Sequence, residues 1–241
     1  MCALCIHLSN RPSLLLRIAE TLRSMTHPRP QTRAVIANPM LALPAEILGI
    51  RIPDSDVPVA AMALARSAMP PTLLNHCLRT FLLGMIDARK RTLHVDDEAC
   101  FVSSILHDVA LLAKYSGDPM KSFEENGADL ARTFSLNRGF SADRADKIAK
   151  AILLHAGQAD GMGPDIEFVM AGAAQDVFGP SPEQLSDDQV AAMERAVPRL
   201  AFKAEFLALL KDHVKRTKTP TWTAGFVTDP PPSFLKNRWS E

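Results

Sequence analysis

The stretch Ser103–Leu112 reads SSILHDVALL and carries His107 and Asp108 side by side within an otherwise apolar run. The spacing of its apolar residues is typical of a buried helix. Burying two ionisable groups costs roughly several kcal/mol unless they are paired or bind a metal ion. The stretch therefore predicts a helix inside the core that also carries a polar site.

Helical periodicity continues on both sides of this stretch, from residue 59 onward. Ser122 with Glu125 forms a capping-box pattern, and Ser141 and Ser186 stand where helix N-caps are expected. The sequence has no glycine-rich phosphate loop and no hairpin turn between alternating strands. We expect an all-α fold in one domain, with helices over 59–68, 72–91, 96–114, 122–137, 142–154, 164–178, 186–195 and 198–216.

The two ends of the chain differ from this helical centre. Residues 1–58 are expected to form an N-terminal helix over Pro12–Met25 and a proline-rich arm that packs on the core, with one short turn near Pro44–Leu48. Residues 59–217 form the domain, and 218–241 form an extended tail that holds Trp222 and Trp239. The arginine-rich, acid-poor segment 1–35 fits an amphipathic helix better than an organelle-targeting segment.

Composition limits the classes of function. The 241 residues are 47% hydrophobic and 22% charged, and the 27 basic residues balance the 27 acidic ones. This balance argues against binding to nucleic acid or to an anionic membrane surface. No apolar run reaches the roughly 18 residues of a transmembrane helix. The four cysteines suggest no disulfide framework, so a cytoplasmic location is expected; Cys2, Cys5 and His7 lack the further ligands of a closed zinc site.

Two more polar residues stand in apolar helical stripes, His76 and Asp176. Alone, each has an ordinary explanation, as a hydrogen-bonded core histidine or as a polar residue near a helix end. Together with His107 and Asp108 they supply two imidazoles and two carboxylates from three helices. Such a mixed nitrogen and oxygen set suits a divalent metal ion, which also offsets the cost of burying the carboxylates.

The order His, His-Asp, Asp resembles the HD-domain superfamily of metal-dependent hydrolases. Longer phrases resemble its cyanamide-hydratase-type branch, namely Ile52–Gly84 with PPTLLNH, Asp96–Leu111, Lys121–Arg132 with KSFEENGADLAR, Ala151–Gly157, and the helix that holds Asp176. The resemblance covers about half of the chain and implies an HD-domain helical bundle. One departure is the apolar pair Leu111-Leu112 after His-Asp, which we expect to close the pocket on one side.

The resemblance implies His76, His107, Asp108 and Asp176 as ligands of one divalent ion per chain. Zinc is the expected ion, and iron, manganese or nickel are compatible. It also places His155 and Glu124 near the metal as candidate proton carriers, although each stands near a helix end where it interacts with the helix dipole in any case. Asn75 and Arg79, beside His76, are candidates for substrate binding or for holding a ligand.

Three functions remain open at this stage. The first is a small-molecule hydratase that adds metal-activated water to a nitrile-type carbon, converting cyanamide to urea. The second is a phosphohydrolase acting on a nucleotide or phosphomonoester, which requires cations to hold phosphate. The third is a non-catalytic protein that keeps the fold. A small molecule is the expected partner in the enzymatic cases, and a homo-oligomer is compatible with the apolar arm and tail.

Overall fold

The computed structural model describes residues 43–218 and 221–240. The predictions for Pro12–Met25, for the arginine-rich start and for Cys2, Cys5 and His7 therefore lie outside the described residues. The described elements are β1 (Glu46–Ile47), β2 (Ile50–Arg51), α2 (Asp56–Ala68), α3 (Pro71–Lys90), α4 (Asp97–Leu106), the 3-10 turns η1 (Val109–Leu111) and η2 (Ala113–Tyr115), α5 (Phe123–Leu136), α6 (Ala142–Leu154), α7 (Pro164–Phe178), α8 (Asp187–Ala196), α9 (Phe202–Arg216), α10 (Trp222–Thr228) and α11 (Pro232–Leu235).

Helices dominate this architecture, which confirms the all-α prediction. The predicted caps are also confirmed: Ser122 and Ser186 each form a capping box, and the Ser141 side chain accepts a hydrogen bond from the backbone of Arg144. These caps satisfy backbone donors that a helix start leaves open. Across the described residues, every helix is too short or too polar to cross a lipid bilayer.

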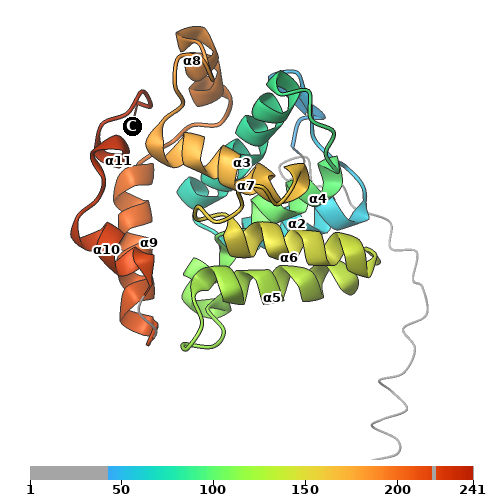
Figure 1. The fold of residues 1–241 in the computed structure, drawn as a ribbon, viewed down its shortest axis with the longest axis vertical. Helices are drawn as coiled ribbons and strands as arrows, with labels where there is room; N and C mark the ends of the chain where they lie inside the picture. The colour runs from blue at the N-terminus through green and yellow to red at the C-terminus, as the bar shows by residue number, and fades with distance from the viewer. Residues whose placement is uncertain (1–42, 219–220, 241) are drawn as a thin grey trace, which may run out of the picture. The chain divides into compact units, whose positions relative to one another are not determined.

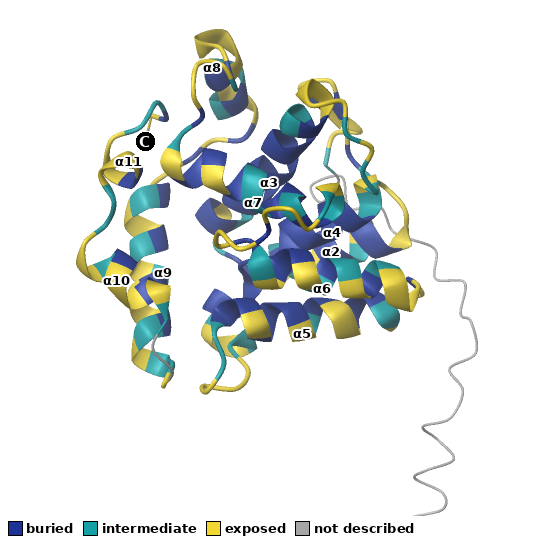
Figure 2. Cartoon of the chain, in the orientation of Figure 1, coloured by how far each residue is buried: buried dark blue, intermediate teal, exposed yellow. Residues whose placement is uncertain are grey.

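Helix α4 lies at the centre of the bundle. It packs against α2, α3, α5, α6 and α7, and all eight of its residues from Ala99 to Leu106 are buried. Figure 1 shows α5 and α6 side by side as an outer pair, and Figure 2 shows exposed residues along their outer sides. The apolar run of the sequence is thus explained by burial on every side of α4.

The predicted continuous helix over 96–114 is wrong, because α4 ends at Leu106. His107 keeps helical angles, whereas Asp108 has φ −103° and ψ 6°, in the sparsely populated region between helix and strand. The 3-10 turns η1 and η2 follow. Neighbouring residues on a helix point in different directions, so the change of backbone at Asp108 lets both polar side chains reach one site.

Two glycines let α3 and α7 approach closely. A Cβ atom on Gly172 would lie 2.0 Å from the carbonyl oxygen of Thr80, and one on Gly84 would lie 2.6 Å from the ring of Phe168. At Gly172 a side chain would force the two helices apart, and at Gly84 it would displace the ring of Phe168. The close approach brings Asp176, one turn after Gly172, to the part of α3 that carries His76.

The two ends of the described chain differ from the sequence predictions. Before α2, Leu48 and Gly49 both have positive φ and form the turn of an antiparallel hairpin between β1 and β2. Each strand has only two residues, too few to show the alternation of apolar and polar residues that predicts a strand. The tail is not extended: it folds into α10 and α11. The Trp239 side chain is buried, and its indole Nε1 donates a hydrogen bond to the Gln175 carbonyl at 2.8 Å.

Candidate metal centre

Three buried donor atoms form a nearly equilateral triangle. His76 Nε2 lies 3.2 Å from His107 Nε2 and 3.4 Å from Asp108 Oδ2, and His107 Nε2 lies 3.3 Å from the same oxygen. A tetrahedral ion with bonds of about 2.0–2.1 Å places its ligand atoms about 3.3–3.4 Å apart. The three atoms therefore have the spacing of one face of a tetrahedral metal site, and they are a group of potential metal ligands among the described residues.

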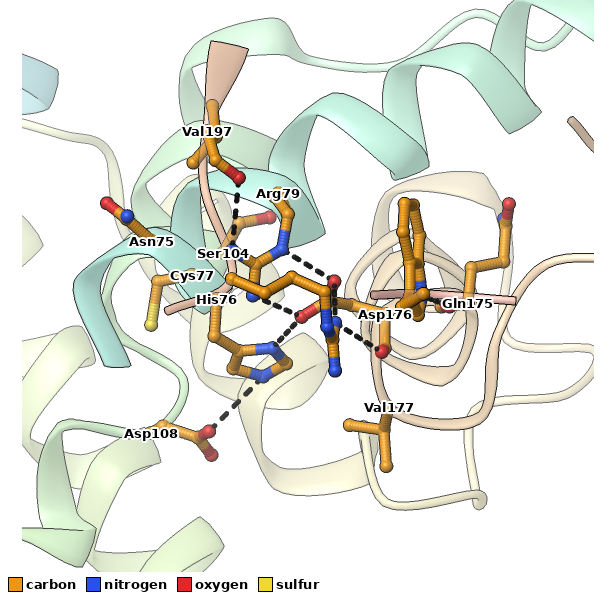
Figure 3. A network of polar contacts seen from close by, with 12 residues as sticks. Asn75, His76, Cys77, Arg79, Ser104, Asp108, Gln175, Asp176, Val177 and Val197 are labelled. Atoms are coloured by element: carbon orange, nitrogen blue, oxygen red, sulfur yellow. Dashed lines mark hydrogen bonds and ion pairs between the residues drawn. The ribbon is translucent and has the colours of Figure 1, made fainter. Parts of the chain in front are cut away.

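The partners of both imidazoles fix which ring nitrogen carries the proton. His107 Nδ1 lies 2.7 Å from the Ser104 carbonyl oxygen, which can only accept a hydrogen bond. His76 Nδ1 lies 2.6 Å from Asp176 Oδ2, and Figure 3 shows this contact on the side of the ring away from Asp108. In the neutral form that a metal ligand requires, each imidazole donates through Nδ1 and turns its Nε2 lone pair to the triangle. A carboxylate that orients a metal-binding histidine in this way is common in metal sites.

Asp108 contributes the charge of the triangle. Burial alone would raise the pKa of its carboxyl, but the imidazoles of His107 and His76 outweigh burial and hold the pKa well below its ordinary value. Its Oδ2 atom is buried and receives no hydrogen bond from the described residues. An anionic oxygen left bare beside two nitrogen lone pairs fits a bound cation.

The charges around His76 also favour a cation at the triangle. Burial by itself would lower the pKa of His76, whereas Asp108 and Asp176 on its two sides together raise the pKa above the ordinary value. A field that favours a proton at this ring also favours a metal cation beside it. The donor set and the field both fit a divalent ion.

Asp176 is not part of the triangle, in contrast to the sequence expectation that it is a fourth ligand. Its carboxylate accepts hydrogen bonds from Arg79 Nε at 2.7 Å and Nη2 at 2.9 Å, and from Arg199 Nη1 at 2.8 Å, besides the contact with His76. Burial would raise its pKa, but Arg79, His76 and Arg199 hold the pKa far below the ordinary value. Asp176 therefore stands behind His76, on the opposite side of the ring from Asp108.

Arg79 and Asn75 occupy positions near Asp176 and the α8–α9 connection. Arg79 is completely buried. It binds Asp176 and donates through Nη1 to the Val197 carbonyl oxygen (Figure 3) and to the Pro198 carbonyl oxygen. Asn75 does not reach the triangle, and its Nδ2 donates to the Pro198 carbonyl at 2.8 Å. Sequence reasoning missed Arg199, because an arginine next to a predicted helix start carries no sign of burial.

His155 completes the polar end of the site. Its Nδ1 lies 2.6 Å from the Ile152 carbonyl oxygen, so Nε2 is the free acceptor, and Nε2 lies 3.7 Å from Asp108 Oδ1. Burial, followed by the charge of His107, lowers the pKa of His155 below its ordinary value. The ring is therefore neutral near pH 7 and able to accept a proton.

Glu124 lies close by but points to a different partner. Its Oε1 accepts a hydrogen bond from Trp222 Nε1 at 2.5 Å, and its Oε2 is buried with no hydrogen-bond partner among the described residues. The negative charge of Glu124 favours the protonated form of His155. The hydrogen bond with Trp222 thus connects Glu124, at the start of α5, to the C-terminal segment.

A cavity of about 200 Å³ opens in front of the triangle. Its polar lining comes from His76, His107, Asp108 and His155. The other lining side chains are apolar or small, and they include Phe123, Phe206, Trp222 and Phe226. Leu111 and Leu112 are not among the lining residues, so the expectation that they close the pocket is wrong. Leu111 is itself the last residue of η1; it is buried, and its carbonyl oxygen accepts a hydrogen bond from Arg216 Nη2.

Comparison with known proteins places these residues in a family context. A family model of the HD domain matches residues 73–195, a stretch that contains the triangle, Glu124, His155 and Asp176. The cyanamide hydratases DDI2 and DDI3 of Saccharomyces cerevisiae are similar to this chain. Each is 25% identical over 191 residues, which cover 76% of this chain and 82% of the yeast protein.

Proposed function

Because the chain belongs to the HD domain family, we propose that it is a metal-dependent hydratase that adds water to a nitrile-type carbon, as in the conversion of cyanamide to urea. The observation that carries this proposal is the triangle of His76 Nε2, His107 Nε2 and Asp108 Oδ2 at the inner end of an apolar cavity. The similarity to two cyanamide hydratases supports the choice of reaction.

His76, His107 and Asp108 would hold the ion, and their chemistry favours zinc, with iron, manganese or nickel as compatible ions. When bound there, a divalent ion supplies Lewis-acid activation of water at neutral pH. Asp176 fixes the orientation and proton position of His76, and the two arginines keep Asp176 ionised. We assign Asp176 this positioning role in place of direct ligation.

The remaining groups account for the protons of the reaction. In hydration of a nitrile the water oxygen becomes a carbonyl oxygen, both π bonds between carbon and nitrogen break, and both water protons end on that nitrogen. His155 is neutral, adjacent to Asp108 and lines the cavity, so it is suited to accept a proton and return it to the substrate nitrogen. The apolar walls keep other water away from these steps.

The absence of basic residues from the described cavity lining favours nitrile hydration over phosphohydrolysis. No lysine or arginine is found among the residues that line the cavity in the described part of the chain. The two nearby guanidinium groups, Arg79 and Arg199, already bind Asp176. A phosphate ester would enter this site without a counter-charge from the protein, so a neutral substrate is the better match.

The proposal is tested by a substrate panel on metal-replete protein. Cyanamide should be converted to urea, measured as urea release, while nucleotides and phosphomonoesters should release no phosphate. Phosphate release without urea formation would contradict the hydratase proposal and support a phosphohydrolase. Loss of urea formation in Asp108→Asn, with the fold retained by circular dichroism, links the activity to the triangle.

A further inference from the structure

The cavity is much larger than cyanamide requires. A space of roughly 10–15 Å³ in this measure holds one water molecule, whereas the cavity measures about 200 Å³. All of its ionisable lining groups lie at the inner end, at His76, His107, Asp108 and His155. The outer part is lined by carbon surfaces, so the space beyond the reacting atoms suits an apolar group.

A continuous path of aromatic rings leads from the polar end to the surface. The ring of Phe206 lies 5.8 Å from that of His76, and Phe226 lies 6.4 Å from Phe206. Phe226 in turn contacts Trp222 at 5.6 Å and Phe178 at 6.3 Å between ring centres. Separations of this size allow favourable ring-to-ring contacts.

The outer end of the path is open to solvent. Trp222 is 43% exposed and Phe178 is 39% exposed, and both line the cavity. Large aromatic side chains left open on one side of a concave site gain free energy when an apolar ligand covers them. The exposed rings therefore mark the mouth of the cavity as a contact surface for such a ligand.

We propose that the site selects a neutral nitrile-type molecule with an apolar, preferably aromatic, substituent. The reactive carbon meets the triangle and His155, while the substituent lies along Phe206, Phe226 and Phe178. This specificity rests on the proposed hydratase function and narrows it. For a substituted cyanamide, R–NH–C≡N plus water gives R–NH–CO–NH₂, with both water protons on the former nitrile nitrogen.

The first test compares benzylcyanamide with cyanamide on metal-replete protein. Burial of a phenyl group adds a binding contribution that corresponds to a rise in kcat/KM of about tenfold or more. A second readout needs no turnover: N-benzylurea, the hydration product, should bind more tightly than urea in isothermal titration calorimetry.

A matched pair of variants locates the substituent. Phe178→Ala should lower the ratio of kcat/KM for benzylcyanamide over cyanamide about fivefold, and should weaken N-benzylurea binding by a similar factor. Leu235→Ala removes a side chain of comparable exposure, 51%, that does not line the cavity. It should leave both quantities unchanged.

The outcomes separate the two proposals. If cyanamide is hydrated but benzylcyanamide is not, and N-benzylurea does not bind, the apolar specificity is overturned and the hydratase function stands. If N-benzylurea binds in a manner that depends on Phe178 but no nitrile is hydrated, the apolar specificity is retained and the hydratase function is overturned. Binding that is equal in Phe178→Ala and the unmodified protein overturns the placement of the substituent.

Discussion

The Nε2 atoms of His76 and His107 face each other across 3.2 Å. The Nδ1 atoms of the two rings donate hydrogen bonds on the opposite side, to Asp176 Oδ2 and to the Ser104 carbonyl oxygen. Two nitrogen lone pairs at this distance repel unless a cation lies between them and a third donor. Asp108 Oδ2 is that donor. The arrangement leads to expectations about metal content, stability and catalysis.

Metal content should depend on the triangle. Elemental analysis of purified protein should find about one divalent ion per chain, and His107→Ala should remove it, because two ligands are too few for a stable site. His94→Ala changes an exposed histidine and should retain the metal. An equal metal content in His107→Ala and His94→Ala would contradict the assignment of the triangle.

The Asp176 carboxylate should matter for both stability and metal affinity. Asp176→Asn leaves Arg79 and Arg199 buried without their anionic partner, which should cost about 3–5 kcal/mol in the free energy of unfolding. It should also weaken metal binding about 10–100-fold, since His76 loses its orienting partner. Chemical denaturation and metal competition measure the two effects. Asp54→Asn, in an exposed pair with Arg51, serves as the control with little effect on either.

Catalysis should distinguish His155 from Glu124. His155→Gln removes the proton acceptor beside Asp108 and should lower kcat about 100-fold, within the usual range for a general base, while metal content is retained. Glu124→Gln keeps an acceptor for Trp222 and should have the smaller effect. If Glu124→Gln abolishes turnover and His155→Gln does not, the proton-transfer role belongs to Glu124.

Close packing of α3 and α7 should not tolerate a methyl group at Gly172. In Gly172→Ala the Cβ would collide with the Thr80 carbonyl, so the helices must separate and Asp176 must move away from His76. We expect a loss of about 1–3 kcal/mol in stability from overpacking, together with weaker metal binding. Gly225→Ala in α10 has nothing within 4 Å of its added Cβ and should be neutral or stabilising, because alanine favours helix. Equal stability of the two variants in urea denaturation would argue against the close approach.

Acid sensitivity should arise partly at Asp96, which caps α4. Its carboxylate accepts hydrogen bonds from Ala99 N at 3.1 Å and from Arg144 at 2.6 and 2.7 Å. Burial would raise its pKa, but Arg144 and the backbone donors together lower the pKa below 3.8. The folded pKa is the lower one, so the stabilisation is fully present above pH 3.8 and is lost as the pH falls through the folded value.

The variant Asp96→Asn tests this linkage, because asparagine still caps the helix but carries no charge. At pH 7 its Tm should fall by about 2–4 °C, which corresponds to about 1 kcal/mol for a partly exposed pair. The difference from the unmodified protein should shrink as the pH drops below 3.8. Asp129→Asn, which changes an exposed pair with Lys121, should show no such pH-dependent difference. A constant difference at all pH values would contradict the assignment.

Amphipathic stripes and Ser-x-x-Glu spacings act within a few residues. Local sequence patterns therefore predicted helices α2 to α9 and the caps at Ser122, Ser141 and Ser186, but not α10 and α11. They did not predict the end of α4 at Leu106, since apolar residues continue to Leu112 without glycine or proline. The break depends on the packing of α4 among five other helices. Local patterns gave no means of detecting it.

The order of His76, His107, Asp108 and Asp176 along apolar helices predicts one shared polar site. The structure divides these four residues into a donor triangle and a carboxylate behind it, and that division depends on the separation of α3 from α7. Gly172 sets this separation through one contact with Thr80. Arg199 lies in the connection before α9, and its ion pair with Asp176 forms only through the tertiary fold. No local sequence pattern predicts it.

The rings of Phe206, Trp222 and Phe226 lie in α9 and α10, after the stretch that the family model matches. The polar groups of the cavity therefore lie inside the matched stretch, whereas three of the five phenylalanine and tryptophan rings that line the cavity lie after it. We expect substitutions in α9 and α10 to alter the outer wall of the cavity while the donor atoms of the triangle stay in place.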